Sequence, residues 1–169
     1  MEIFSAADSL CYYAKNAQKL LKTRKQRVHG LLGIAKQLRI VYRPLGVIGI
    51  ITPWNGPFVL GMNPSVQALM AGSTVVLKGS EVTPYPTKLV EDVFRDAGLP
   101  PGVLQVLMGD GQTGAYLTEA GVDKISFTGS VRTGRLIAET CGRQLIPCTL
   151  ELGGKDAMIV CDDADLDRA

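Results

Sequence analysis

The chain has 169 residues, of which 46% are hydrophobic and 20% charged, and its formal net charge is +2. These values are typical of a single globular domain with its own core and show no compositional sign of disorder. No apolar run is long enough to cross a bilayer, and no basic leader precedes an apolar stretch at the N-terminus. We therefore expect a cytoplasmic protein that makes no membrane contact.

Four cysteines and one histidine are scattered along the chain. Cys11, Cys141, Cys148 and Cys161 form no C-x-x-C pair, and His29 has no partner at metal-ligand spacing. The sequence therefore predicts no metal site, and it predicts thiols that act as small core residues in a reducing compartment.

The charged residues are unevenly distributed. Residues 9–80 contain ten lysines and arginines and no acidic residue, whereas the rest of the chain is acidic. A basic surface can bind nucleic acid, but no aromatic residue interleaves with the densest basic run, at residues 15–27. We expect no nucleic-acid partner, and we interpret the run as a solvated helix face or a surface that meets the acidic half of another subunit.

Residues 1–37 are predicted to form a helical and basic segment that packs on a domain of residues 38–169. Apolar residues at helical spacing predict a helix over residues 5–21, which Ser5 or Asp8 could cap. An irregular basic segment follows, and alternation over residues 38–43 predicts a half-exposed strand.

From residue 47 onward the predicted strands and helices alternate. The continuous apolar run at 47–52 indicates a strand buried on both faces, and Pro64 should kink or restart the next helix. The predicted strands are residues 47–52, 74–77, 103–107, 124–127, 146–151 and 157–161, and the predicted helices are residues 57–71, 86–97, 112–120 and 131–141, with another starting at 162–165. This order is typical of an α/β fold with a doubly wound, mainly parallel Rossmann-like sheet and helices on both faces.

Such sheets bind ligands beyond the carboxyl ends of their strands, and glycine-rich polar loops follow these strands. Residues 109–114 read G-x-G-x-x-G between a strand and a helix, a pattern of pyrophosphate sites. The acidic residue that should follow about twenty positions later, at the end of the next strand, is missing. We therefore interpret residues 109–114 as a turn near a cofactor and do not place the pyrophosphate there.

Thr128, Gly129 and Ser130 form a better phosphate candidate, because they leave a strand and open a helix. The free N–H groups and positive dipole end of a helix suit an anion. Ser130 could equally be a simple helix N-cap, and spacing alone leaves both roles open.

Five segments occur in an order and spacing that resemble the aldehyde dehydrogenase family, over essentially the whole chain from Phe4. They read VIGIITPWNGPF, VVLKGSE, AGLPPGVLQVLMGDG, VDKISFTGS and LELGGK. The resemblance implies a Rossmann-like cofactor domain, NAD as the cofactor with NADP less favoured, and an aldehyde substrate that is oxidised to an acid.

The resemblance also implies roles for individual residues. Asn55 would donate its amide to the oxyanion, and Glu151 would be the base that activates water. Lys78 and Glu81 would bind the adenosine ribose, Thr128 would lie near the nicotinamide, and Ser130 would lie on the pyrophosphate. The implied cofactor contacts are Thr52, Pro53, Trp54, Lys78, Ser80, Glu81, Gly111, Thr128, Gly129, Ser130, Leu152 and Gly153. Without the resemblance, Asn55 could form an Asx-turn, and Lys78 and Glu81 a surface ion pair.

Two features depart from the family. Gly79 stands where the family commonly has proline, which should loosen the loop that carries Glu81. The family's nucleophilic cysteine, the rest of its catalytic domain and its oligomerisation strands would lie outside these residues, and neither Cys148 nor Cys161 matches the nucleophile motif. We expect this chain alone to be inactive and the intact enzyme to be a homo-oligomer. The alternatives are a free-standing dinucleotide-binding module and an interaction protein that uses the basic N-terminal half.

Overall fold

A five-stranded parallel sheet forms the centre of the molecule, which a computed structural model describes over residues 1–168. Its strands are β3 (Val47–Ile51), β4 (Thr74–Lys78), β5 (Leu104–Leu107), β6 (Lys124–Gly129) and β7 (Cys148–Leu152). They lie in the order β5-β4-β3-β6-β7, so the chain starts at the centre, winds to one edge and then returns to build the other. The predicted doubly wound α/β fold is confirmed.

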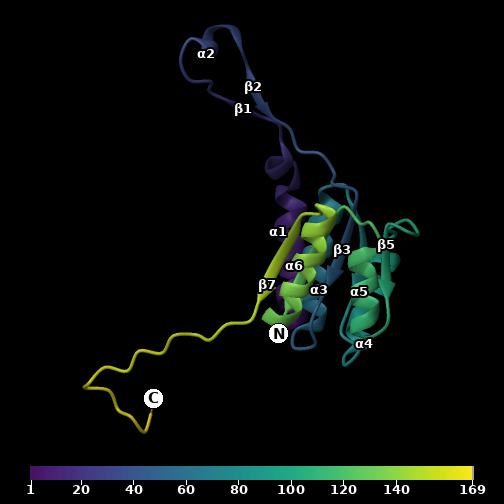
Figure 1. Cartoon of the computed structure of the whole chain (residues 1–169), viewed down its shortest axis with the longest axis vertical. Helices are drawn as coiled ribbons and strands as arrows, with labels where there is room; N and C mark the ends of the chain where they lie inside the picture. The colour runs from purple at the N-terminus through teal and green to yellow at the C-terminus, as the bar shows by residue number, and fades with distance from the viewer. Residues whose placement is uncertain (169) are drawn as a thin grey trace.

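Helices cover both faces of this sheet (Figure 1). The elements α1 (Glu2–Leu21), α3 (Pro57–Met70) and α4 (Pro84–Asp96) share one buried cluster with β3, β4 and β5. A second cluster joins α5 (Gly111–Glu119) and α6 (Val131–Gln144) to the opposite face of β3 and β6. Alternate residues of β3 supply the two clusters, with Ile48 and Ile50 in the first and Ile51 in the second. The apolar run at 47–52 is therefore buried on both faces, as its composition indicated.

Helix α3 continues through Pro64 without the restart that the sequence allowed. A proline inside a helix removes one backbone hydrogen bond. Here α3 packs against α1, α4 and the sheet, and this tertiary packing holds the helix in one piece. Helix α1 likewise begins earlier than predicted, at Glu2, so neither Ser5 nor Asp8 caps it.

An antiparallel ribbon joins α1 to the sheet and projects from one end of the molecule (Figure 1). It consists of β1 (Arg24–Gln26), the short helix α2 (Leu32–Ala35) and β2 (Leu38–Ile40). The sequence pattern predicted a strand over residues 38–43, which is longer than the observed β2, and it predicted no strand in the basic segment before it. Every residue of β1 and β2 is exposed, so the pairing depends on backbone hydrogen bonds, and no burial pattern in the sequence indicated β1.

Beyond β7 the chain leaves the sheet as an extended segment (Figure 1). The strand predicted at 157–161 and the helix predicted from 162 are wrong: residues 153–161 pair with no described strand, and residues 162–168 form turns. Met158 and Ile159 are exposed. An apolar run becomes a strand only where a neighbouring strand accepts its hydrogen bonds, and the described residues supply none here.

Gly79 is buried directly after β4, and its Cα abuts Thr87 of α4. A Cβ added at position 79 would lie 2.8 Å from both Cβ and Cγ2 of Thr87, closer than carbon atoms can approach without a shift. The hydroxyl of Thr87 is itself buried and has no hydrogen-bond partner among the described residues. Lack of space therefore requires glycine at this position.

We expect Gly79→Ala to lower the free energy of unfolding by about 1–3 kcal/mol, because the added methyl group overpacks the contact between β4 and α4. Thr87→Ala in the same chain should recover part of this loss, because it removes Oγ1 and Cγ2 of Thr87 together with an unpaired hydroxyl, while Cβ of Thr87 stays in contact. Chemical denaturation of the two single variants and the double variant measures the coupling.

Gly142→Ala on α6 is the matched control, because a Cβ at Gly142 would meet no atom within 4 Å. This substitution should stabilise the helix by about 0.5–1 kcal/mol. Additive effects of Gly79→Ala and Thr87→Ala would show that the two side chains do not compete for space.

Candidate functional site

A cavity of about 360 Å³ opens at the carboxyl edge of the sheet. Its lining comes from the loops after β3, β4 and β6 and continues along α5 and the first three turns of α6. Ten of the twelve predicted cofactor contacts line it: Thr52, Pro53, Trp54, Lys78, Ser80, Glu81, Gly111, Thr128, Gly129 and Ser130. The other two, Leu152 and Gly153, lie at the end of β7 and do not line this cavity.

Lys78 is the most buried charged group of the site. Its side chain is 5% exposed, and its ammonium lies 3.3 Å from Oε2 of Glu81, whose side chain is 56% exposed. The backbone N–H of Glu81 and the ammonium of Lys78 hold the pKa of the Glu81 carboxyl below its ordinary value. Glu81 thus presents an ionised carboxylate at the cavity rim, and the ammonium of the more deeply buried Lys78 neutralises its charge.

The loop after β6 closes another side of the cavity. Ser130 is the N-cap of α6, where its hydroxyl oxygen accepts a 3.1 Å hydrogen bond from the backbone N–H of Thr133. A Cβ at Gly129 would lie 2.6 Å from the Phe127 ring, so glycine is needed for space. Both roles that the sequence left open for Ser130 fit this position, since it caps the helix and also lines the cavity.

Thr52 contributes an unusual polar atom. Thr52 is 5% exposed and lines the cavity, and its hydroxyl has no hydrogen-bond partner among the described residues. A buried hydroxyl without a partner costs free energy, which a bound molecule could recover by accepting or donating the missing bond.

The G-x-G-x-x-G loop takes a peripheral position. Asp110 caps α5 by accepting a 3.0 Å hydrogen bond from the backbone N–H of Gln112, and Gly111 and Gly114 line the cavity. Gly109, with φ of 147°, only makes the turn and does not reach the cavity. This geometry agrees with a turn beside the cavity.

Sequence reasoning missed the helical part of the lining. These residues share helical spacing and face the cavity from α5 and α6: Gly114, Ala115, Thr118 and Glu119 from the first helix, and Thr133, Leu136, Ile137 and Thr140 from the second. Ile51 and Phe127 form its apolar floor. The repeat of small and hydroxyl residues three and four positions apart after each glycine-rich loop was the available signal.

The two predicted catalytic residues lie outside the cavity. Asn55 is exposed in the loop between β3 and α3, and Glu151 is exposed on β7. Glu151 is in register with Thr128 on the neighbouring strand. The strands β3, β6 and β7 are adjacent and parallel, so both residues belong to the same edge of the sheet as the cavity.

The cysteines are separate from this cavity. None of the four, all within the described residues, lines it. Burial and the neighbouring Cys148 raise the pKa of the Cys141 thiol, which keeps it protonated and unreactive. No group of three or more histidine, cysteine, aspartate or glutamate residues in the described part of the chain could hold a metal ion.

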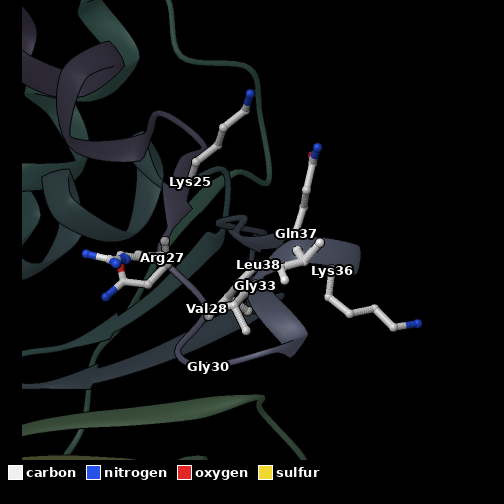
Figure 2. A pocket seen from close by; sticks show the side chains of 10 residues that line it. Lys25, Arg27, Val28, Gly30, Gly33, Lys36, Gln37 and Leu38 are labelled. Atoms are coloured by element: carbon white, nitrogen blue, oxygen red, sulfur yellow. The ribbon is translucent and has the colours of Figure 1, made fainter.

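A second hollow lies inside the loop of the β1–β2 ribbon (Figure 2). Its volume is about 450 Å³, and Lys25, Arg27 and Lys36 are among its lining residues. All but one of the lining residues are exposed, and none is buried, so this hollow is an open loop with flexible cations and lacks a rigid set of polar groups.

Among the described helices, none is long and apolar enough to cross a bilayer.

We expect Glu81 to titrate below the ordinary value of a glutamate, and Lys78→Met to move its pKa upward by removing the ammonium that favours the ionised form. Side-chain carboxyl shifts in ¹³C NMR give both midpoints. Since the folded pKa lies below the unfolded one, the contribution of Glu81 to stability is present above the ordinary glutamate pKa and is lost as pH falls through the folded value. An unchanged midpoint in Lys78→Met would contradict the pairing.

Comparisons with known proteins place the chain in a family. A profile described as "Aldehyde dehydrogenase family" matches residues 1–169. The chain is 45% identical over 168 residues to the 4,4'-diapolycopene aldehyde oxidase of Methylomonas sp, a match that covers 99% of this chain and 32% of that protein. It is 44% identical over 159 residues to a Mycolicibacterium smegmatis protein named as a succinate-semialdehyde dehydrogenase [NADP(+)], covering 94% of this chain and 30% of the relative.

A solved structure is also similar. The Mycobacterium tuberculosis aldehyde dehydrogenase complexed with NAD+ superposes with a TM-score of 0.87 at 39% identity, covering 99% of this chain and 34% of that one. The chain therefore spans about a third of the length of the relatives it matches. The family profile, the relatives and the solved structure agree over nearly the whole chain, and the chain belongs to the aldehyde dehydrogenase family.

Proposed function

We propose that this chain is the NAD-binding part of an enzyme that oxidises an aldehyde to a carboxylic acid. The observation that carries the proposal is the cavity at the carboxyl edge of the sheet, with the unpaired hydroxyl of Thr52 in its lining. Dinucleotides bind at this edge in doubly wound folds, and family membership supports the same assignment. When bound, NAD would accept the hydride that leaves the substrate.

The residues at this edge have the chemistry that the proposal needs. The carboxylate of Glu81 accepts hydrogen bonds and fits ribose hydroxyls. Ser130 opens α6, whose N-terminal dipole favours a pyrophosphate, and Thr128 belongs beside the nicotinamide. Leu152 and Gly153, at the end of the neighbouring strand β7, would contact the same end of the cofactor.

Two exposed residues would act on the substrate. The Asn55 side-chain amide donates hydrogen bonds and would stabilise the negative charge that develops on the aldehyde oxygen. The Glu151 carboxylate would take a proton from water as that water releases the acid from the enzyme. Their exposure leaves room for an aldehyde and for the rest of an enzyme about three times as long.

The cellular setting is proposed on the same basis. We place the whole enzyme in the cytoplasm, as a homo-oligomer, without nucleic acid or membrane as a partner. We divide this chain into an N-terminal segment over residues 1–37 and a dinucleotide-binding domain from residue 38. The charge asymmetry supports an interface between the basic ribbon and an acidic surface of another subunit.

A free-standing dinucleotide-binding module is the second candidate. It is favoured by one observation: described residues of this chain form the whole lining of the cavity, and no cysteine is among them. The two candidates differ in chemistry but share the cofactor, so aldehyde oxidation by the intact protein separates them, whereas both predict an inactive chain when these 169 residues are tested alone.

We expect the isolated 169-residue chain to produce no NADH from any aldehyde, because covalent capture of the aldehyde needs a thiolate beside the nicotinamide. Absorbance at the NADH band, with short-chain, aromatic and long apolar aldehydes, is the measurement. Turnover that Cys148→Ser or Cys161→Ser abolishes would identify a nucleophile within these residues.

We expect NAD to bind more tightly than NADP, by about tenfold to a hundredfold, since hydrogen bonds to charged groups contribute about 1.5–3 kcal/mol. The Glu81 carboxylate would accept bonds from the ribose hydroxyls, whereas it would repel the 2′-phosphate of NADP. Glu81→Ser should narrow the gap. Calorimetric titration of both cofactors against both proteins measures it.

Glu139→Ser is the matched control, because it also removes one exposed carboxylate but lies on α6 outside the cavity lining. It should leave the preference intact. Equal affinities in the original chain, or a gap that Glu81→Ser does not change, would remove Glu81 from the site.

A further inference from the structure

The first turn of α3 has an incomplete cap of its own. Its N-cap, Gly56, has no side chain that could accept a hydrogen bond, and the first helical residue, Pro57, has no N–H. The backbone N–H of Leu60 donates to the carbonyl oxygen of Gly56 at 2.9 Å. The amides of Phe58 and Val59 therefore still need acceptors.

Glu2 supplies both acceptors from a distant part of the chain. Its Oε2 accepts hydrogen bonds from the backbone N–H of Phe58 at 2.9 Å and from that of Val59 at 3.1 Å. With these two bonds every N–H of the first turn has a partner. The carboxylate also lies at the positive end of the α3 dipole, where a negative charge is stabilising.

The packing of α1 on α3 holds Glu2 in this position. One turn beyond Glu2, Ala6 is 1% exposed and belongs to the core cluster that includes Phe58. At the other end of the contact, Nε2 of Gln67 donates a 2.7 Å hydrogen bond to the hydroxyl of Tyr13. Residue numbers rise together along both helices, so α1 and α3 run parallel and are joined at two points.

The loop between β3 and α3 is consequently fixed at both ends. At its start, the backbone N–H of Thr52 donates to the carbonyl oxygen of Lys78 at 3.1 Å, which continues the β3–β4 pairing. At its end, Glu2 holds the first turn of α3. Only residues 53–56 lie between, and they include Trp54, at the cavity, and Asn55.

We propose that Glu2 is a positioning residue, whose carboxylate sets where the loop places Trp54 against the cofactor and Asn55 against the substrate. The significance of these two positions rests on the function proposed above. The same carboxylate blocks the N-terminus of α3 to anions, which leaves the N-terminus of α6, at Ser130, for the cofactor phosphates.

Trp54 provides the test, because it is the single tryptophan of the chain. Its time-resolved fluorescence anisotropy reports the motion of the loop directly, and NAD affinity reports the consequence for the cavity. The variants are Glu2→Ala, which removes the acceptor, and Glu2→Gln, whose amide oxygen can accept the same bonds without the charge. Asp8→Asn is the control, because it removes an exposed negative charge from the same helix.

Glu2→Ala should increase the amplitude of fast Trp54 motion and weaken NAD binding by about threefold to tenfold, because binding must then order the loop. Glu2→Gln should lie between Glu2→Ala and the original chain, and Asp8→Asn should match the original chain in both measurements. Circular dichroism at the temperature of the experiment shows whether each variant is folded. If Glu2→Ala does not fold, Glu2→Gln still tests the proposal through the Trp54 anisotropy.

Trp54 motion that remains at the original level in folded Glu2→Ala, or in Glu2→Gln when Glu2→Ala is unfolded, would overturn the positioning role. Equal effects of Glu2→Ala and Asp8→Asn would also overturn it, because they would assign the change to charge on α1. Failure of the original chain to bind NAD would instead contradict the proposed function, and the anisotropy comparison would still decide the role of Glu2.

Discussion

The burial of β3 on both faces is the constraint from which the rest of the structure follows. A strand in the middle of a parallel sheet must be apolar on both sides, and Ile48, Ile50 and Ile51 meet this requirement. Parallel neighbours can be joined only by crossovers, which here are helices that cover the two faces. Every loop that leaves a carboxyl end therefore opens at the same edge, and the cavity forms where the loops from β3, β4 and β6 meet.

This edge concentrates polar groups that the apolar layers cannot hold. Lys78 ends β4 almost fully buried, and its charge is tolerated because Glu81 neutralises it at 3.3 Å. Thr52 directly follows β3, and its buried hydroxyl has no partner among the described residues. An apolar floor with a few polar groups held in place above it is typical of a ligand site that is formed before the ligand binds.

Helix packing also brings a distant residue to the loop between β3 and α3. Gly56 and Pro57 leave the first turn of α3 without a local cap, and Glu2, more than fifty residues earlier, completes it. Helix α1 thereby links the N-terminus of the chain to the edge that carries the cavity. The contribution of α1 is thus both apolar, through Ala6 in the core, and electrostatic, through Glu2.

The sequence alone determined the elements whose signals are local. The apolar run of β3 and the alternation of strands and helices predicted the doubly wound fold, and the family motifs supplied ten residues that line one cavity. Only the tertiary structure decided features that need a distant partner. Exposed β1 exists because β2 pairs with it, and residues 157–161 form no strand because no described strand is beside them. Glu2 caps α3 because two helices pack in parallel, and the helical half of the cavity lining appears only once α5 and α6 lie on the sheet. Backbone pairing and side-chain packing between distant residues leave no local pattern in the sequence, and for that physical reason local patterns could not predict these features.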